Sequence, residues 1–431
     1  MLDPGTAALR PGTPVKARCV IVGGGVMGVS IAWHLAARGD PVSEPVVLLE
    51  KTALAAGSSG RSGAILRQHY SQREVAAMAR DSLRVYAEFA GRTGRSIGFQ
   101  RTGVLTLAGP ERPEDVALVE RNVAMQIEIG IETRLVTASE IRRLVPGIVV
   151  RDGSVGAFEP GGGGVDPVAT VEAFAAVARE KGAITRVGVA ATDLLRCGDR
   201  VVGVQTNDGP IEAETVVVAA GPWSRRLLLA AGVDFPLRTV RPEQQFFAMP
   251  RAAKERDAAG PEEARELEPA AHPVLLDVEH GFYTRCESHA SRTGLPTPRT
   301  RVGRMDYAED REIDDPDAID ETVGAEFRAW ARARLESRLP VYRDLPDAGG
   351  SVGMYTLSPD AQALIGPVAG VPGLVVVSGF SGHGFKLAPS VGEGVAQLLA
   401  GDPVSAFDAD FFAPDRFRSG ASAPFGRAFG L

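Results

Sequence analysis

The clearest hydrophobic pattern lies near the start of the chain, where two short apolar runs enclose a stretch with helical spacing. The first run covers residues 19–22, the helical stretch ends near Arg38, and the second run covers residues 46–49. Two buried runs on either side of a helix are typical of a strand–helix–strand unit. The pattern therefore predicts such a unit at the start of the fold.

Three glycines at the junction of the first run and the helix, Gly23, Gly25 and Gly28, have the G-x-G-x-x-G spacing. Such glycines allow a tight turn, the approach of backbone N–H groups to a pyrophosphate, and close packing of the helix on the strand. Glu50 ends the second run about 20 residues after the last glycine, where a dinucleotide fold has its ribose-binding acid. We therefore predict a dinucleotide site; the alternative is a glycine-rich loop in an ordinary α/β sheet.

The rest of the chain contains both helical and strand-like spacing. Helical spacing predicts helices over residues 73–88, 113–130, 138–144, 167–181, 320–339 and 390–399, and an acidic helical insert over residues 251–268. Short apolar runs predict strands over residues 98–107, 184–189, 215–220 and 374–377, and a hairpin over residues 191–207. Thr137 and Glu140 have the spacing of a capping box at the start of the third helix.

Glycine-rich segments at both ends of the chain would have to converge on one ligand, which predicts a discontinuous cofactor domain. We expect an α/β protein, α+β overall, whose dinucleotide-binding domain is split by an inserted second domain. The cofactor domain is expected over residues 17–90, 156–236 and 349–405. The second domain is expected over residues 91–155 and 237–348, with tails at residues 1–16 and 415–431.

Composition limits the classes of function. The 431 residues carry a net charge of -7, which argues against nucleic-acid or anionic-membrane binding. No apolar run approaches the roughly 20 residues of a membrane span, so a soluble cytoplasmic protein is expected. Cys19, Cys197 and Cys286 are scattered and lack metal-ligand spacing, so we expect neither a metal site nor a disulfide framework.

Four segments together carry a family resemblance: the opening unit, residues 57–67, the strand end at Ala220–Trp223, and the motif Gly379–Lys386. From about Arg18 to Phe412 the chain resembles the sarcosine oxidase branch of the D-amino-acid-oxidase-type flavoproteins. The resemblance implies FAD rather than a nicotinamide cofactor. It also implies a split Rossmann-like FAD-binding domain with an inserted antiparallel-sheet substrate domain.

The glycine turn and the resemblance together give the expected FAD-binding positions. These are Gly23, Gly25, Val26, Met27, Gly28, Glu50, Lys51, Ser58, Ser59, Arg61, Ser62, Val189, Ala220, Gly221, Trp223, Gly353, Gly382, His383, Gly384, Phe385 and Lys386. The backbone contact with adenine that the family makes falls on Val189 or Ala191, because the register is ambiguous. Gly353 stands where covalent-flavin relatives have a cysteine, so we expect non-covalent FAD.

The resemblance also implies a substrate site. Arg67 and Lys386 match the family's two carboxylate-binding cations, Tyr283 and Tyr355 match the aromatic wall of its pocket, and His383 would lie near the flavin. The alternatives are solvated surface charges for the two cations, core tyrosines with satisfied hydroxyls, and a structural role for His383. His34 and His69 are expected to be ordinary helix or loop residues.

Three positions depart from the family pattern. Ala64 replaces an arginine of some oxidases, Arg301 or nothing matches the lysine that assists oxygen, and Met305 aligns with a catalytic histidine. The electron acceptor, oxygen or another carrier, is therefore left open. The expected activity is FAD-dependent oxidation of the C–N bond of an amino acid or N-alkyl amino acid. The alternatives are a primary or D-amino-acid oxidase, a dehydrogenase with another acceptor, and a flavin subunit that needs a partner protein.

Overall fold

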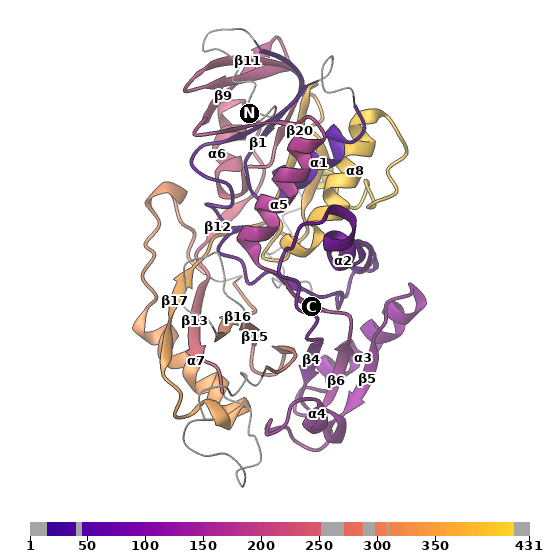
Figure 1. The fold of residues 1–431 in the computed structure, drawn as a ribbon, viewed down its shortest axis with the longest axis vertical. Coiled ribbons are helices and arrows are strands. Elements are labelled where there is room, and N and C mark those ends of the chain that lie inside the picture. The colour runs from indigo at the N-terminus through magenta and orange to yellow at the C-terminus, as the bar shows by residue number, and fades with distance from the viewer. Residues whose placement is uncertain (1–14, 40–44, 251–270, 288–297, 308–309, 418–431) are drawn as a thin grey trace.

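The computed structural model describes residues 15–39, 45–250, 271–287, 298–307 and 310–417. Within this part of the chain, two eight-stranded sheets lie one beyond the other along the longest axis of the molecule (Figure 1). The first sheet contains the glycine turn. The second sheet belongs to the part of the chain that the sequence assigns to substrate binding.

The first sheet has a parallel core. Its order is β19-β20-β11-β1-β2-β8, and the antiparallel strands β9 and β10 extend from β11. Its strands are β1 (Val15–Val22), β2 (Val46–Glu50), β8 (Ile184–Val187), β9 (Ala191–Cys197), β10 (Arg200–Thr206), β11 (Gly209–Val218), β19 (Leu364–Pro367) and β20 (Leu374–Ser378). Alternate residues of β1 enter two different cores, Ile21 on one face and Val20 on the other. Burial on both faces explains why these strands are continuous apolar runs.

Helices cover both faces of this sheet. Helices α1 (Val26–Ala36), α5 (Pro167–Glu180) and α8 (Ala388–Ala400) pack on one face, and α6 (Ser224–Ala230) lies on the other side with the β9–β10 hairpin (Figure 1). Gly28 lies where α1 meets β1. A Cβ atom added there would be 1.9 Å from the carbonyl oxygen of Gly23. Only glycine permits this contact, which confirms the reason given for the third glycine of the motif.

The second sheet is mostly antiparallel, with order β17-β13-β16-β15-β14-β4-β6-β5. Its strands are β4 (Val104–Ala108), β5 (Arg134–Thr137), β6 (Val155–Glu159), β13 (Glu243–Ala248), β14 (Val274–Asp277), β15 (Phe282–Glu287), β16 (Arg299–Arg304) and β17 (Asp347–Val352). Helix α7 (Ala325–Arg338) packs on one face through Phe327 and Leu335, which meet Phe247, Phe282 and Val302. Helices α3 (Pro113–Glu128) and α4 (Ala138–Leu144) flank the β5–β6 end (Figure 1).

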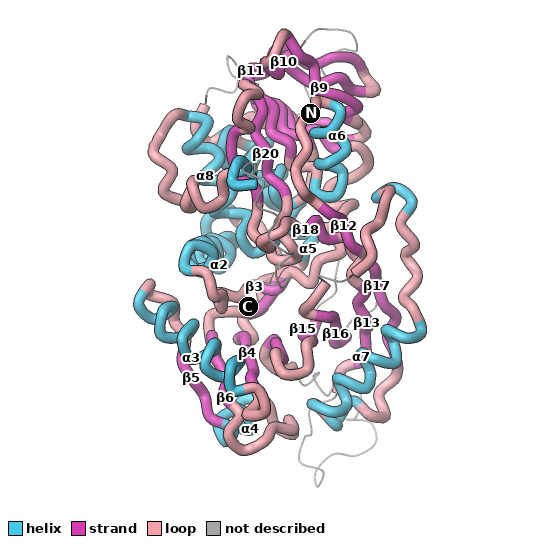
Figure 2. The backbone as a smooth tube through the Cα atoms, turned by 180° about the vertical axis from the view of Figure 1, so that it is seen from behind, coloured by secondary structure: helices cyan, strands magenta, loops and turns pink. Residues whose placement is uncertain are grey.

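Two short ribbons lie between the large sheets (Figure 2). One pairs β3 (Ile65–Leu66) with β7 (Gly163–Gly164), and the other pairs β12 (Arg238–Val240) with β18 (Tyr355–Leu357). The first ribbon packs against the 3-10 turn η5 (Phe385–Leu387), and α2 (Arg73–Thr93) follows it in the chain. The ribbons place Arg67, Tyr355 and Lys386 near the junction of the two sheets.

Most predicted elements are confirmed. Thr137 and Glu140 form the capping box before α4, and the hairpin at residues 191–207 is β9–β10. Two predictions were too long. Residues 320–324 form no helix and α7 begins only at Ala325, while the predicted strand at residues 98–107 begins at Val104. The predicted insert helix at residues 251–268 lies outside the described residues.

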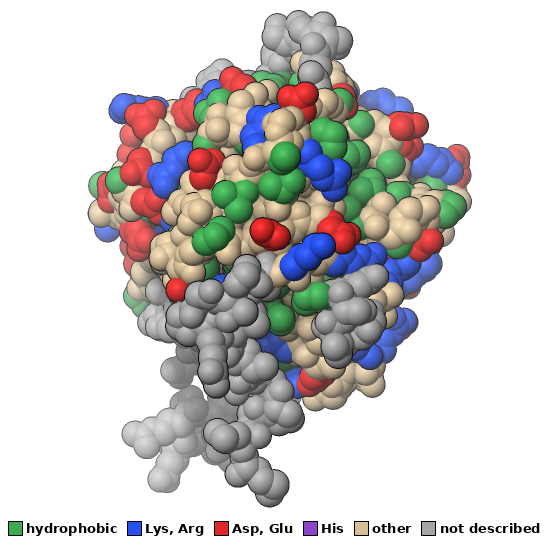
Figure 3. All heavy atoms as spheres, turned by 90° about the horizontal axis from the view of Figure 1, so that it is seen from above, with side chains coloured by type: hydrophobic (Ala, Val, Ile, Leu, Met, Phe, Trp, Pro, Cys, Tyr) green, Lys and Arg blue, Asp and Glu red, His purple; other side chains and the backbone are tan. Residues whose placement is uncertain are grey.

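The described helices include none that is long and apolar enough to cross a membrane. On the face shown in Figure 3, acidic and basic side chains are interspersed among neutral and apolar ones. The exact domain boundaries given above stay a prediction.

Candidate active site

The glycine turn of β1–α1 is held by the end of β2. The carboxylate oxygen Oε2 of Glu50 accepts the N–H of Gly24 at 2.8 Å, and Oε1 accepts the N–H of Thr52 at 2.9 Å. Gly23 has φ 117°, and a Cβ atom there would be 2.5 Å from the carbonyl oxygen of Ala219. The turn thus needs glycine both for its backbone conformation and for its contact with the end of β11.

The serine-rich loop after β2 covers the start of α1. Ser59 Oγ accepts the N–H of Val26 at 2.9 Å, so this hydroxyl lies against the first helical turn. The hydroxyl of Ser58 is buried and has no hydrogen-bond partner among the described residues. Unpaired N–H donors and hydroxyls at a helix N-terminus are suited to phosphate oxygens.

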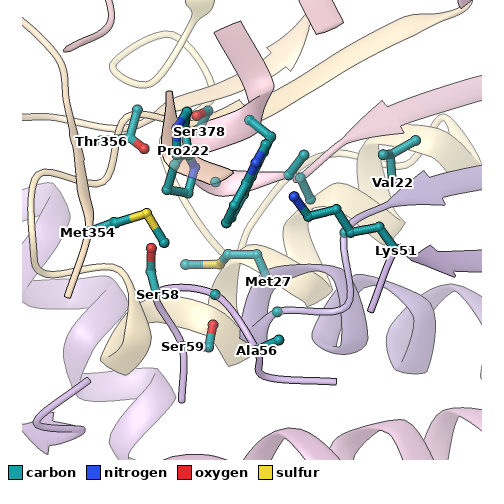
Figure 4. A pocket seen from close by; sticks show the side chains of 18 of the residues that line it. Val22, Met27, Lys51, Ala56, Ser58, Ser59, Pro222, Met354, Thr356 and Ser378 are labelled. Carbon is teal, nitrogen blue, oxygen red and sulfur yellow. The ribbon is translucent and has the colours of Figure 1, made fainter. Parts of the chain in front are cut away.

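A continuous cavity of about 910 Å³ runs past this turn (Figure 4). The predicted positions that line it come from all parts of the chain: Gly23, Gly25, Val26, Met27, Glu50, Lys51, Ser58, Ser59, Arg61, Ser62, Val189, Ala220, Gly221, Trp223, Tyr355, Gly382, Gly384 and Phe385. Ala191 also lines it, so the two candidates for the adenine contact remain open. Figure 4 shows Lys51, Met27 and Met354 around this space.

Four of the predicted cofactor positions do not line the cavity in the described residues. Gly28 lies behind the turn, and Gly353 lies beside Pro242. His383 and Lys386 are buried behind the motif that contains Gly382 and Gly384. The backbone of that motif is in the left-handed region at Ser381, with φ 48°, and at Gly382, with φ 86°. A non-glycine residue in this region is strained, which is common where backbone approaches a ligand.

Two acidic residues of the segment 316–321, which follows strand β16 in the chain, line the edge of the cavity. Asp317 forms an ion pair with Lys51 and accepts the indole N–H of Trp223 at 2.9 Å, and the Lys51 ammonium lies 3.9 Å from the centre of that ring. Glu321 pairs with Arg61 at 2.5 Å. Both acids line the cavity and neither was predicted, because only the tertiary structure brings residues 316–321 to the first sheet.

These observations fit a bound FAD. The cavity passes from Glu50, a ribose-type acid, over the N-terminus of α1 and the Ser58 hydroxyl, to Tyr355 on the side of the second sheet. Glycine is required at Gly23 and Gly28 by contacts with backbone atoms. FAD contains a ribose, a pyrophosphate and a flavin ring system, and these parts need an acid, a helix N-terminus and an enclosed end of the cavity in this order.

Beyond this cavity, Arg67 lies in a buried polar group. Its Nη1 donates to the carbonyl of His69, and its guanidinium lies 4.0 Å from the centre of the Tyr70 ring. The carboxylate of Glu159, at the end of β6, accepts the N–H groups of Gln68 at 2.6 Å and His69 at 3.1 Å. Burial raises the pKa of Glu159 to about 6, although the Gln68 bonds and the charge of Arg67 oppose the shift.

Sequence analysis did not single out Glu159, Tyr70 or a buried role for His69. His69 is fully buried, and burial followed by the charge of Arg67 lowers its pKa to about 3. It lies in a loop, as expected, and is buried rather than exposed. A signal was present, since Glu159 ends an apolar strand immediately before Pro160 and four glycines. A charged residue at that position of a buried strand is unusual unless it is bonded.

Lys386 is buried in the same group. Its Nζ donates to the carbonyl of His383 at 3.4 Å. Burial and the charge of Arg67 hold the pKa of Lys386 well below its ordinary value, and Glu159 opposes this shift. The solvated-surface alternative for Arg67 and Lys386 is therefore wrong, because both side chains are buried.

His383 is held as a neutral ring. Its Nε2 lies 2.8 Å from the carbonyl of Ala361, and a carbonyl can only accept, so Nε2 carries the proton. Burial and the charge of Lys386 lower the pKa of His383 to about 3. Its Nδ1 is buried without a partner in the described residues, and its ring lies 5.6 Å from that of Tyr70.

The two tyrosines form one wall of the site, where Tyr283 lies against Gly63 and Tyr355 lies against Gly382. Their hydroxyls hydrogen-bond to each other, and burial raises the pKa of both. A Cβ atom at Gly382 would be 2.9 Å from the Tyr355 ring, so this loop and ring are in close contact. The site therefore combines two buried basic side chains with two tyrosines whose hydroxyl groups keep their protons.

One group of possible metal ligands lies elsewhere, on the outer part of the second sheet. Asp277, Glu279 and His280 come together, but Arg338 donates to Asp277 at 2.7 Å and to Glu279 at 2.9 Å. Arg338 Nη2 also lies 2.6 Å from the Nδ1 atom of His280. The arginine supplies the positive charge for these acids, and no metal needs to be invoked.

The fold and the cavity define a flavin-dependent oxidoreductase. A family described as FAD dependent oxidoreductase (DAO) matches residues 18–398, and the chain belongs to this family. FAD is its cofactor.

Relatives of known name agree with this assignment. The chain is 29% identical over 425 residues to 4-methylaminobutanoate oxidase (formaldehyde-forming) of Paenarthrobacter nicotinovorans, an alignment that covers 96% of this chain and 47% of that protein. It is 28% identical over 386 residues to monomeric sarcosine oxidase of Bacillus sp. (strain NS-129), covering 88% of this chain and 92% of that protein. The chain thus spans about half the length of the first of these relatives and nearly the whole of the second.

Solved structures have the same fold. L-proline dehydrogenase from P. horikoshii superposes with a TM-score of 0.79 at 26% identity, covering 95% of this chain and 99% of that one. Glycine oxidase from Geobacillus kaustophilus superposes with a TM-score of 0.75 at 22% identity, covering 93% and 99%. The expected Rossmann-like FAD fold, with a substrate-side sheet, is confirmed.

Proposed function

We propose that the protein oxidises the C–N bond of an N-alkyl amino acid, giving an imine that water hydrolyses. The observation that carries the proposal is the burial of Arg67 and Lys386 together beside the FAD cavity. Burying cations costs free energy unless anions compensate them, and Glu159 brings a single carboxylate to the group that holds these two cations. A substrate carboxylate is the anion that this site is suited to receive.

Each group has a role in this proposal. Arg67 and Lys386 grip the carboxylate through charge-assisted hydrogen bonds, which orients the amine. Tyr283 and Tyr355 exclude water and disfavour the charged ammonium by desolvation. FAD, when bound, would supply the electron sink for the hydride of the carbon next to nitrogen. Glu159 fixes the backbone after Arg67, and neutral His383 braces the loop that carries Lys386.

The names of the relatives support the class of substrate. One relative is named for 4-methylaminobutanoate and another for sarcosine, both N-methyl amino acids. Because the first relative is about twice as long as the aligned segment, its substrate does not transfer as a finding. The activity, the substrate and the site roles above are therefore our proposal.

The electron acceptor is part of the proposal as well. Arg301, the expected counterpart of the oxygen-assisting lysine, is a buried cation on the second sheet. A cation near the flavin favours electron transfer to oxygen by electrostatic attraction of the superoxide formed. We propose oxygen as the acceptor, and another carrier is the alternative. The cytoplasmic location expected from the sequence stays a prediction.

Anaerobic reduction of the purified holoprotein tests the proposal. N-methyl, cyclic and primary amino acids are added in turn, flavin absorbance is followed, and air is then admitted. Bleaching by N-methyl amino acids with rapid recolouring and peroxide formation is the expected result. Bleaching without recolouring contradicts oxygen as acceptor, and failure of every carboxylate-bearing amine to bleach the flavin contradicts the roles of Arg67 and Lys386.

A further inference from the structure

The inner face of the second sheet carries an unusual set of polar side chains. Across β13, β16 and β15, Gln244 pairs with Gly303, and Gly303 pairs with Tyr283. Two residues further along strands β15 and β16, Arg285 pairs with Arg301. Because side chains alternate between the faces of a sheet, both arginines lie on the same face as Tyr283. The opposite face packs against α7. These polar side chains therefore face the junction with the first sheet rather than solvent.

Arg301 borders the loop that leads to Arg67. A Cβ atom at Gly63 would lie 3.4 Å from Arg301 Cδ and 3.8 Å from the Tyr283 hydroxyl. Gly63 directly follows Ser62, which lines the FAD cavity, and stands four residues before Arg67. Four residues of chain span at most about 14 Å, so Arg301 and Arg67 border the same short loop.

The guanidinium of Arg301 donates to two side chains of the same sheet. Its Nε donates to Glu287 at 2.7 Å and its Nη1 donates to Gln244 Oε1. Glu287 is shared, because Arg299 Nε also donates to it at 2.6 Å. The hydrogen bonds that Arg301 makes to described residues thus use its Nε and Nη1 groups.

Gln244 contributes an unused donor at the same place. Arg301 can only donate, so the side-chain oxygen of Gln244 must face it, which fixes the amide orientation. Its Nε2 group is then buried, and no described residue accepts from it. A buried donor without an acceptor is costly, and such groups commonly mark the place of a ligand.

Arginine and amide donors next to one another suit an oxyanion. A carboxylate offers two acceptor oxygens, which match two converging N–H donors. Arg67 and Lys386 already account for one carboxylate under the proposed function. The donors on β13 and β16 would then serve a second one.

We propose that Arg301 and Gln244 bind a second carboxylate, so that the preferred substrates are amino acids whose amine carries or adjoins two carboxylate arms. The inference rests on the proposed function and specifies the substrate class of the same site. The first carboxylate lies at Arg67 and Lys386, the amine lies between the tyrosine wall and the flavin, and the second carboxylate points to the inner face of the sheet.

Equilibrium binding to the holoenzyme tests this without turnover. The probes are thiodiacetate and (methylthio)acetate, in which sulfur replaces the amine and which differ by one carboxylate. A hydrogen bond to a charged group corresponds to an affinity difference of about 10- to 150-fold, and the wild type is expected to prefer thiodiacetate by this amount in calorimetric titration.

Two variants and one control locate the effect. Arg301→Gln removes the charge and keeps a donor toward Glu287, and Gln244→Glu places a negative charge beside Arg301 at constant size. Both should bring the two affinities close together. Arg304→Gln is the matched control, because Arg304 is on the same strand but its guanidinium lies 5.1 Å from the Trp330 ring of α7. This control should keep the preference.

Equal affinities in the wild type, or a preference that survives both Arg301→Gln and Gln244→Glu, would overturn the inference. If Arg301→Gln does not retain flavin, Gln244→Glu alone decides. The proposed function is judged separately, by bleaching with sarcosine. Bleaching by sarcosine together with equal probe affinities refutes only the second carboxylate site, whereas absence of bleaching by any amino acid refutes the proposed function itself.

Discussion

Replacement of Lys386 by methionine separates binding from stability. The ammonium lies in a buried group with Arg67, it donates to the carbonyl of His383 at 3.4 Å, and burial lowers its pKa well below the usual value. Methionine has a similar length and no charge. A hydrogen bond between charged groups contributes roughly 1.5 to 3 kcal/mol, so a carboxylate ligand should bind about 10- to 150-fold more weakly.

Stability should change in the opposite direction. A lysine whose pKa is lowered on folding binds fewer protons in the folded state than in the unfolded state. The cost of burying it is present at neutral pH and disappears only as pH rises toward the unfolded pKa of about 10.4. Lys386→Met should therefore have an equal or higher free energy of unfolding at pH 7, provided that FAD is bound in both proteins at saturation.

The assay is a titration of (methylthio)acetate followed by flavin absorbance, paired with urea unfolding of the same preparations. Lys181→Met, at the exposed end of α5, is the matched control and should change neither quantity. Unchanged ligand affinity in Lys386→Met would refute the carboxylate-binding role. Loss of both affinity and stability would show instead that Lys386 supports the fold.

Three further predictions concern the cofactor and pH. Gly28→Ala should lose most bound FAD, because the new Cβ would lie 1.9 Å from the carbonyl oxygen of Gly23; a flavin-to-protein absorbance ratio equal to that of the wild type would contradict this. Acid precipitation should release all flavin into the supernatant, since Gly353 offers no thiol, and a yellow pellet would indicate a covalent link. The neutral state of His383, whose pKa burial lowers to about 3, stabilises the fold above pH ~6.5, and this contribution is lost as pH falls from there toward 3. The free energy of unfolding should therefore fall less steeply between pH 7 and 5 in His383→Asn than in the wild type.

The glycine turn and its acid could be predicted from the sequence because their geometry is local. A tight turn, a helix start and a following strand involve about 30 consecutive residues, so the spacing alone is enough to recognise the unit. Gly23, Gly28 and Glu50 accordingly lie where the spacing indicated. The motif at Gly379–Lys386 was equally visible, since its glycines follow directly on a buried strand.

The helix at the end of the insert shows where local spacing fails. Residues 320–324 carry helix-compatible side chains, yet they form no helix and continue the segment that brings Asp317 and Glu321 to the FAD cavity. The ion pairs with Lys51 and Arg61 join elements more than 250 residues apart. No local pattern reports such contacts, because they depend on how the two sheets are placed.

The sequence by itself determined the glycine turn, its acid and the FAD-binding fold, and it proposed Arg67 and Lys386 as the substrate-side cations. What only the tertiary structure decided was which polar residues surround them. Glu159 and Gln244 reach the site through the register of antiparallel strands, and a shift of one residue would turn each side chain to the opposite face. Register is set by the packing of the whole sheet, so it is not written in any short segment of the chain.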